Sequence, residues 1–413
     1  MNILMLGRWL PPSRCPIRAT REYQFARHLA RAHRLTLAFV TDNQDAAGSI
    51  SVLRSEFGDL EFAAVPRGWQ SLLSALRLAT GESCTLSYSR SAALRTRLAD
   101  RLKSTPYSLV FVTSSSMIQY ALEVDPAIPL AVDFGDVESE WWRRQSERGT
   151  FPGTRFFNAE ATRLRTAEAA GARRAARCFT ATDAAAATVR AFAPEAPLAV
   201  VPNGLDLDFF GTGLRPGKTP TLVFNGSLVD EAEIHDFQEF CRTVLPAVRA
   251  RVPGARFVVT GRERPAAARV GAMAGLEIVA PVSDVRPFLH DQTVAVAPLR
   301  SATDVRALVL EPMAAAVPVV ATTKACEQVM GRPGRDLQVA DDPLEFALHV
   351  VRLLESAPLR RELGDHGRRL VEASFAWDVY GGQLAEAIDG IMKLSGGPSG
   401  AGPVNPLTTA AKR

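Results

Sequence analysis

The sequence predicts an α/β protein with two doubly wound domains that face a cleft. Short apolar runs alternate with longer amphipathic segments, the pattern of parallel strands covered by helices on both faces. The run of strands starts again after a Pro- and Gly-rich stretch at 209–220, a composition that marks a linker. A chain of 413 residues is also too long for one ordinary core.

Strands are expected where apolar runs of strand length are bounded by turn-forming residues. These runs are 2–7, 35–41, 60–66, 108–115, 129–135, 176–182 and 198–204, and then 219–227, 255–261, 276–281, 293–299 and 317–322. Helical segments between them include 22–33, 155–176, 239–252 and 343–375. The expected domains are residues 1–200 and 201–375, with ligands at the carboxyl ends of the strands.

The composition indicates a globular protein, with 47% hydrophobic and 22% charged residues. No apolar run reaches the roughly 18 to 20 residues that span a bilayer, and the start MNILMLGRWLPP is unlike a signal peptide. We therefore expect a cytoplasmic location. Five scattered cysteines without a CxxC pair suggest reduced packing residues, with neither a disulfide framework nor a zinc site.

The net charge of +4 is unevenly distributed. Residues 1–200 carry 25 Lys and Arg against 19 Asp and Glu, whereas the remainder carries 23 against 25. The basic half is either a solvated surface or a face for an anionic membrane or an anionic acceptor. The sequence leaves both alternatives open. The last residues, 393–413, are expected to be disordered because they hold too few apolar groups to pack.

Glu311 is the first candidate for a functional residue, because it interrupts the small and apolar run VLEPMAAAVPVVAT. A buried carboxylate costs several kcal/mol unless it is paired or hydrogen-bonded. Either a ligand needs Glu311, or it pairs with Arg306 on the same helix. Gly226 and Gly261 each end an expected strand, where a glycine lets backbone amides approach a phosphate or simply forms a tight turn.

The first strand leads into GRWLPPSRCPIRATREYQF, which replaces the GxGxxG of dinucleotide-binding proteins. The sequence also lacks GxSxG, HExxH and GxxxxGK[ST], which argues against serine hydrolases, zincins and P-loop enzymes. Arg18 and Arg21 lie just before or at the start of a helix. They either face the cleft and bind an anionic group or are ordinary surface arginines.

An ordered set of motifs resembles the GT-B glycosyltransferases of family 4. In the second half these are VPNGLDLDFF, LVFNGS, ARFVVTGR, VSDVRPFLHDQTVAVAPLR, VLEPMAAAVPVVAT, QVADDPLEFA and SFAWDVY. In the first half VDFGDVESEWW, the helix around Glu160 to Glu168, and REYQFARHLARAHRLTL are similar to the sugar transferases of exosortase and exopolysaccharide loci. The resemblance covers residues 1–390 and implies two Rossmann-like domains and a helix at 376–392 that returns to the first.

The resemblance also implies a reaction: retaining transfer from a nucleotide-sugar donor in the C-terminal domain to an acceptor in the N-terminal domain, with no metal and no cofactor. Glu311 matches the second glutamate of an E-x7-E pattern that binds the donor ribose. The other implied donor-side positions are the turn residues Asn203 and Gly204, Gly226, Ser227, Gly261, Arg262, Val282, Ser283, Asp284, Thr303, Asp304, Val305, Arg306 and Val309. Among these, Arg262 and Arg306 are expected to stabilise the leaving diphosphate.

Several positions depart from the pattern. Thr303 stands where the first glutamate is expected, and the other departures are Asp304, Ala307, Leu308 and Ala316. In the first domain, Asp133 and Asp136 replace a histidine. Asp136 either orients the acceptor or the transferred sugar, or caps the following helix. Trp141 and Trp142 either form an acceptor platform, on the side where Asp133, Arg18 and Arg21 are expected, or at least one of them packs in the core.

Three functions fit these observations. The first is a glycosyltransferase with a polysaccharide, lipid-linked or other small-molecule acceptor. Its basic half either contacts a membrane or does not, and no binding of nucleic acid is expected. The second is a catalytically degenerate GT-B protein that activates a partner transferase, motivated by Thr303, Asp304 and Leu308. The third is a nucleotide-sugar epimerase, for which the sequence offers acidic residues but no matching histidine.

Overall fold

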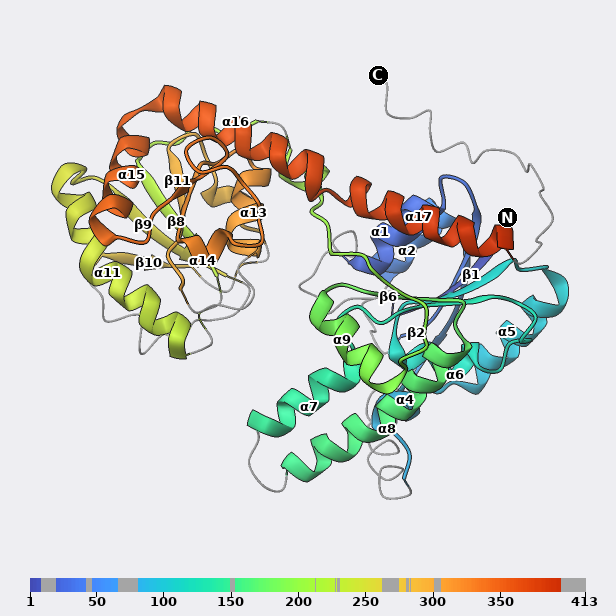
Figure 1. Cartoon of the computed structure of the whole chain (residues 1–413). Helices are drawn as coiled ribbons and strands as arrows, with labels where there is room; N and C mark the ends of the chain where they lie inside the picture. The colour runs from blue at the N-terminus through green and yellow to red at the C-terminus, as the bar shows by residue number, and fades with distance from the viewer. Residues whose placement is uncertain are drawn as a thin grey trace. The chain divides into compact units, whose positions relative to one another are not determined.

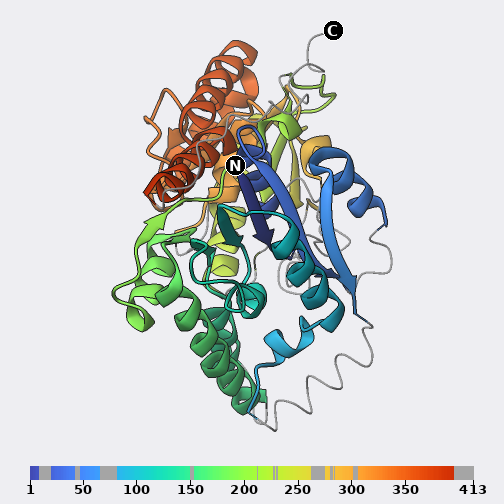
Figure 2. The same ribbon diagram turned by 90° about the vertical axis from the view of Figure 1, so that its right-hand side faces the viewer.

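The chain forms two compact units, Met1–Asn203 with Tyr380–Arg413, and Gly204–Val379. The computed structural model describes residues 1–8, 20–41, 47–65, 81–148, 153–211, 213–226, 228, 231–261, 275–279, 282, 284–300 and 306–394. In each unit, helices lie on both faces of a parallel sheet (Figures 1 and 2). The predicted fold class is therefore confirmed.

Unit 1 contains a seven-stranded sheet in the order β3-β2-β1-β4-β5-β6-β7. Its strands are β1 (Asn2–Leu6), β2 (Arg34–Thr41), β3 (Asp59–Ala64), β4 (Leu109–Val112), β5 (Leu130–Asp133), β6 (Arg177–Thr180) and β7 (Leu198–Val200). All neighbouring pairs are parallel. The strand order reverses between β1 and β4, and ligands of doubly wound sheets bind at such a switch point.

The helices of unit 1 begin where the sequence supplies caps. They are α1 (Arg21–Leu29), α2 (Ala47–Phe57), α4 (Cys84–Tyr88), α5 (Ala92–Ser104), α6 (Ile118–Ala121), α7 (Glu138–Arg148), α8 (Gly153–Arg174) and α9 (Asp183–Phe192), with a 3₁₀ turn at Ser115–Met117. The Thr20, Ser83, Ser91 and Thr182 hydroxyls each accept a hydrogen bond from a first-turn amide, which satisfies a donor that the helix leaves unpaired.

Unit 2 repeats the arrangement with the order β10-β9-β8-β11-β12-β13. Its strands are β8 (Thr221–Asn225), β9 (Arg256–Thr260), β10 (Leu276–Ile278), β11 (Thr293–Ala297), β12 (Val319–Ala321) and β13 (Gln338–Val339). Its helices are α10 (Leu207–Phe210), α11 (Glu231–Arg251), α13 (Arg306–Ala314), α14 (Thr323–Cys326), α15 (Pro343–Glu355) and α16 (Ala357–Ser374), with a 3₁₀ turn at Arg286–Phe288. The switch point lies between β8 and β11. The final helix, α17 (Trp377–Leu394), starts in unit 2 and belongs to unit 1 from Tyr380.

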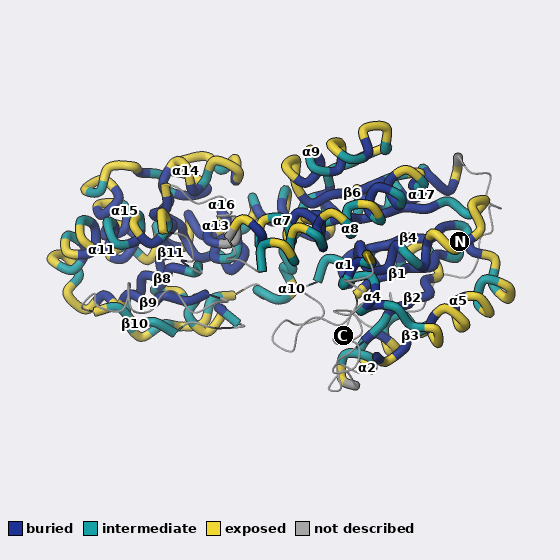
Figure 3. The backbone as a smooth tube through the Cα atoms, turned by 90° about the horizontal axis from the view of Figure 1, so that it is seen from below, coloured by how far each residue is buried: buried dark blue, intermediate teal, exposed yellow. Residues whose placement is uncertain are grey.

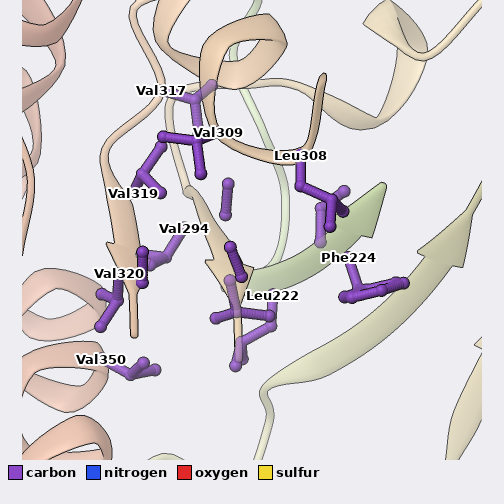
Figure 4. Packing of buried hydrophobic residues seen from close by; sticks show 14 of the residues in the cluster. Leu222, Phe224, Val294, Leu308, Val309, Val317, Val319, Val320 and Val350 are labelled. Atoms are coloured by element: carbon purple, nitrogen blue, oxygen red, sulfur yellow. The ribbon is translucent and has the colours of Figure 1, made fainter. Parts of the chain in front are cut away.

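Apolar side chains fill the space between sheet and helices in both units. The central strands of each sheet are mostly buried, the edge strands β3, β7, β10 and β13 are largely half-buried, and the outer faces of the helices are exposed (Figure 3). In unit 2 the side chains of Leu222, Phe224 and Val294 pack with those of Leu308 and Val309 (Figure 4). Within the described residues no helix is long and apolar enough to cross a membrane.

The Pro- and Gly-rich stretch at 209–220 is not the linker that its composition predicts. The chain passes between units at Asn203 and Gly204, and the whole stretch belongs to unit 2. Arg215 forms a β-bridge with His290, and the Gly217 amide donates a 2.6 Å hydrogen bond to Asp291. These contacts hold the described part of the stretch against unit 2, so its turn-forming residues make surface turns within that unit.

Candidate functional site

The switch point of unit 2 contains the carboxylate that the sequence singled out. Glu311 lies on α13, the first helix after β11, and is half-buried. Its Oε2 accepts a 2.6 Å hydrogen bond from Nδ2 of Asn225, the last residue of β8. Because β8 and β11 are the strands at which the order reverses, this bond lies where a doubly wound sheet binds its ligand.

Thr260 fixes the Asn225 amide in the orientation that serves Glu311. The Thr260 hydroxyl, at the end of β9, is fully buried and lies 3.2 Å from Asn225 Oδ1, to which it donates. With its oxygen accepting from Thr260, Asn225 turns its NH₂ group toward Glu311. Sequence reasoning missed both residues, each of which directly precedes one of the two candidate glycines, Gly226 and Gly261.

The glycine turn beside Asn225 is required by packing. A Cβ on Gly226 would lie 2.8 Å from the Phe224 ring and 2.9 Å from Leu308 Cδ2, closer than Cβ atoms approach other carbons. The Gly226 amide donates to the Thr260 carbonyl at 2.9 Å, and the Gly261 carbonyl accepts from the Val282 amide at 2.8 Å. These bonds tie together the ends of neighbouring strands at which the donor is expected.

Val309 corrects the predicted donor-side set. Its side chain is fully buried in the apolar cluster (Figure 4), so it is a packing group and does not line a ligand surface. Leu308 is also buried there, which explains why an apolar residue replaces the expected polar one. Arg306 begins α13. Six other predicted positions lie outside the described residues: Ser227, Arg262, Ser283, Thr303, Asp304 and Val305.

Asp284, in the loop expected to read the nucleotide base, is engaged by an arginine. Arg286 donates to it from Nε at 2.9 Å and from Nη2 at 2.8 Å. The guanidinium lies 3.9 Å from the centre of the Phe209 ring, a cation–π contact. These hydrogen bonds lower the pKa of the Asp284 carboxyl below its ordinary value. The pair anchors the loop to α10.

Ala316, the departure just after α13, is in the left-handed region with φ +58°. L-residues there cost about 1 to 2 kcal/mol, and glycine avoids most of that cost. We expect Ala316→Gly to raise the free energy of unfolding by about 0.5 to 1 kcal/mol, after the entropy that glycine loses on folding. Urea unfolding measures this, with Ala373→Gly on the exposed face of α16 as a control that loses stability. A loss in both variants would show that position 316 does not favour glycine.

Unit 1 brings three of the predicted residues together at the carboxyl ends of its strands. Arg21, at the start of α1, donates to both oxygens of Asp133 at 2.7 and 2.9 Å. A further 3.0 Å bond runs from Arg21 Nη1 to Asn203 Oδ1, and the guanidinium lies 4.3 Å from the centre of the Phe25 ring. Arg21 is thus paired with Asp133, and its contact with an anionic group of a ligand stays a prediction. Arg18 lies outside the described residues.

Two glutamates that the sequence analysis missed extend this group. Glu22 follows Arg21, and Glu138 begins α7 and accepts a 2.8 Å hydrogen bond from the Ser114 hydroxyl after β4. The pKa of Glu22 is raised to about 7, chiefly by burial and also by the nearby charges of Asp133 and Glu138, against the lowering by its own backbone hydrogen bond and by Arg21. Glu22 is thus a carboxyl that holds its proton near neutral pH.

The raised pKa of Glu22 predicts that stability depends on pH. The folded state binds a proton that the unfolded chain loses above about 4.5, so the stabilisation is complete below that pH and is lost as pH rises to about 7. Glu22→Gln should remove this loss and be more stable than wild type at pH 8, by up to about 3 kcal/mol. Urea unfolding at pH 4.5, 6 and 8 measures it, with the exposed Glu195→Gln as control. A pH dependence unchanged by Glu22→Gln would contradict the assignment.

Asp136 and Trp141 lie near the same strand end and differ in their surroundings. Asp136 is exposed, and among the described residues its carboxylate has no hydrogen-bond or ionic partner. The residue directly before α7 is Val137, so Asp136 does not cap that helix as one alternative held. The Trp141 side chain is 54% exposed and meets Trp142 edge to face at 4.8 Å. Trp142 is half-buried and packs against Phe156 and Phe157, between α7 and α8.

The described residues contain no group of three or more His, Cys, Asp or Glu side chains arranged to hold a metal ion. Four of the five cysteines are described, and all are free. Burial raises the pKa of the Cys178 and Cys241 thiols to about 12, so both are unreactive packing groups. Two polar groups lie at strand ends: the unit 2 strand-end group is Glu311, Asn225 and Thr260, and the unit 1 strand-end group is Arg21, Glu22, Asp133 and Glu138.

The fold is that of the GT-B glycosyltransferases. Residues 219–356, within unit 2, match the family model of the glycosyl transferases group 1. No curated protein sequence matches the chain.

Solved structures of low sequence identity share the architecture over almost the whole chain. Sucrose-phosphate synthase from Thermosynechococcus elongatus is 13% identical over 95% of this chain and 99% of its own, with a TM-score of 0.56. Anabaena HepE in complex with UDP is 14% identical over 94% and 100%, with a TM-score of 0.54. A variant of S. aureus TarM in complex with fondaparinux, alpha-GlcNAc-glycerol and UDP is 9% identical over 95% and 99%, with a TM-score of 0.52.

Proposed function

We propose that the protein is a retaining glycosyltransferase that moves a sugar from a nucleotide-sugar donor to a polysaccharide, lipid-linked or other small-molecule acceptor. One observation carries this proposal. Within the segment that matches the glycosyl transferases group 1 model, a carboxylate on α13 is held by a strand-end asparagine at the switch point of the sheet. A carboxylate there is placed to accept hydrogen bonds from ligand hydroxyls.

We assign the donor to unit 2, with Glu311 binding the ribose of the nucleotide. The amides at the start of α13 favour an anion such as the diphosphate, and Arg262 and Arg306 are the candidate cations beside it. Anabaena HepE, which shares the fold, was crystallised with UDP. UDP is therefore the first nucleotide to test, although nothing in the described residues selects among bases.

We assign the acceptor to unit 1. Its strand-end group offers an ion pair, Arg21 with Asp133, and a proton-holding carboxyl, Glu22. The exposed Asp136 and Trp141 supply a hydrogen-bond acceptor and an aromatic face, and aromatic faces suit sugar rings. TarM, in the complex with alpha-GlcNAc-glycerol, has the same fold, which supports testing small carbohydrate acceptors.

In the proposed reaction the bond from the anomeric carbon to the diphosphate oxygen breaks, and a bond to an acceptor hydroxyl oxygen forms on the same face. The hydroxyl proton goes to the departing diphosphate. Catalysis then rests on positioning and on stabilising the charge of the leaving group, the roles proposed for Arg262, Arg306 and the backbone at 303–306. We propose that neither a metal nor a cofactor takes part, and activity in EDTA tests the first point.

The cellular setting is a further part of the proposal. The resemblance to family 4 enzymes of exopolysaccharide loci and the basic first half of the chain support a cytoplasmic enzyme that meets a lipid-linked acceptor at the membrane face. Binding to vesicles with and without anionic lipid, at low and at physiological salt, tests the membrane contact.

The test of the function is turnover with UDP-, GDP-, ADP- and dTDP-sugars, with octyl glycosides as acceptors. The proposal expects one donor to release its nucleotide, faster with an acceptor than with water alone, and NMR to show a product with the anomeric configuration of the donor. No release from any donor would favour the second candidate, a GT-B protein that activates a partner. Thr303, at the position of the missing glutamate, is the observation behind that candidate.

A further inference from the structure

A buried carboxylate outside both strand-end groups controls the geometry of one of them. Glu168, on α8, is fully buried. Its Oε1 accepts hydrogen bonds from the Ser115 hydroxyl at 2.7 Å and the Ser139 amide at 3.1 Å, and its Oε2 accepts one from the Ser139 hydroxyl. Ser115 follows β4, and Ser139 lies in the first turn of α7, after β5. One side chain thus ties together the segments that follow the neighbouring strands β4 and β5.

The segment that Glu168 holds has an unusual backbone. Gly135 and Val137 both have positive φ, +56° and +62°, and a β-branched residue in the left-handed region is an outlier that persists only where its surroundings hold it. The Val137 amide donates to the Phe134 carbonyl at 2.9 Å, and the Ala181 amide donates to the Gly135 carbonyl at 2.9 Å. With Ser139 held by Glu168, the turn is fixed on both sides of Val137.

This turn carries polar groups of unit 1. Asp136 precedes the strained residue and is exposed, and Glu138 follows it and is held by Ser114. Burial raises the pKa of Glu168, the three hydrogen bonds oppose that rise, and the charge of Glu138 adds to it. A fully buried carboxylate is a costly way to hold a turn, which suggests that the turn must be held in one geometry.

We propose that Glu168 is a positioning residue, which fixes the Gly135–Ser139 turn so that Asp136 and Glu138 meet the sugar at the unit 1 strand ends. The inference rests on the proposed glycosyltransferase function. Glu168 itself touches no substrate and acts only through the turn. Misplacing groups at a reacting centre by about 1 Å costs about 100-fold in rate. Loss of the Glu168 carboxylate should therefore lower kcat. It should leave donor affinity unchanged, because the donor is assigned to unit 2.

The same helix offers a matched control. Glu160 lies two turns earlier on α8, is also fully buried, and also accepts three hydrogen bonds, from Ser83 Oγ at 2.7 Å, the Cys84 amide at 2.6 Å and the Thr85 amide at 2.9 Å. Those partners belong to the start of α4 and not to the strand-end turn. Glu160→Ala therefore removes an equivalent buried carboxylate without releasing the turn.

The experiment compares Glu168→Ala, Glu168→Gln and Glu160→Ala with wild type, using the UDP-, GDP-, ADP- or dTDP-sugar that the wild-type protein turns over. We expect Glu168→Ala to lower kcat about 100-fold with an unchanged dissociation constant for the donor. Glu168→Gln keeps an acceptor for Ser115 and the Ser139 amide and should recover kcat to within a few-fold. Glu160→Ala should lose stability and keep kcat. Equal loss of kcat in both alanine variants would overturn the proposal.

Amide hydrogen exchange gives a readout that does not need activity. Glu168→Ala should speed exchange at Val137 and Ala181, and Glu160→Ala should not. Unchanged exchange at these amides in Glu168→Ala overturns the inference, whether or not the protein transfers sugar. If exchange is faster in Glu168→Ala but the wild-type protein turns over no donor, the proposed function is refuted, while the role of Glu168 in holding the turn is supported. If Glu168→Ala does not fold, Ser139→Ala takes its place, with the same expected results.

Discussion

Replacing Glu311 with alanine is expected to weaken the binding of the nucleotide sugar about 100-fold while leaving the protein folded. Hydrogen bonds to a charged group contribute about 1.5 to 3 kcal/mol each, and the loss of one or two of them corresponds to this factor. Isothermal titration of wild type and Glu311→Ala with each donor measures the change. Glu355→Ala, at the exposed end of α15 in the same unit, is the control and should bind like wild type.

The companion variant Asn225→Ala separates binding by Glu311 from its positioning. Asn225 holds Glu311 Oε2 but is not proposed to contact the ribose, so we expect a smaller loss of affinity, about 10-fold, the equivalent of one hydrogen bond. Thr260→Val should act in the same direction and less strongly, because it frees only the orientation of the Asn225 amide. Wild-type affinity in Glu311→Ala would remove Glu311 from the donor site.

Arg21→Ala should cause the largest loss of stability among single substitutions in unit 1. The Asp133 side chain is 2% exposed, and removal of its partner leaves an uncompensated buried charge, which costs about 3 to 5 kcal/mol. The double variant Arg21→Ala, Asp133→Asn should lose less than Arg21→Ala alone, because the stranded charge is gone. Urea unfolding followed by circular dichroism measures both.

The chain offers a control with the same geometry at the surface. Arg95 donates to both oxygens of Glu123 at 2.7 Å, but these side chains are 45% and 47% exposed. Arg95→Ala should cost no more than about 1 kcal/mol, because water screens and replaces the pair. Equal losses in Arg21→Ala and Arg95→Ala would mean that the Arg21–Asp133 pair is not the buried anchor described above.

The strands of both sheets could be predicted because burial on two faces leaves nearly continuous apolar runs. Every strand of unit 1 overlaps a predicted run, although β2 and β3 each begin one residue earlier than predicted, and among the described strands of unit 2 only β13 was missed. β13, Gln338–Val339, is two residues long and half-buried, so it has no periodicity to detect. The linker was misplaced because turn-forming residues mark surface turns within a domain as well as the boundaries between domains.

The candidate sites were predicted only in part. The residues that were found stand out in their local sequence, whereas the residues that were missed depend on neighbours far away in the chain. Glu311 could be found because a carboxylate within an apolar run is anomalous in sequence. Asn225 and Thr260 could not, since their role depends on neighbours 86 and 35 residues away in the chain. The pKa of Glu22 likewise depends on burial and on Asp133 and Glu138, which no local pattern around REYQF reveals.

The structure also changes the meaning of two departures from the family pattern. Leu308 is a core residue packed beside Gly226, and Ala316 carries a backbone cost after α13. Leu308 still leaves an apolar side chain where the resemblance implies a polar one. The question of catalytic competence therefore rests on Leu308 together with Thr303 and Asp304, which lie outside the described residues.

The most direct test of the central claim is a crystal structure of the protein with the nucleotide sugar that binds in the titrations, UDP-glucose being the first to try. The account predicts nucleotide density at the carboxyl ends of β8 and β11, with ribose hydroxyls within about 2.5 to 3.0 Å of the Glu311 carboxylate. A nucleotide bound elsewhere, or a ribose that does not contact Glu311, would contradict it.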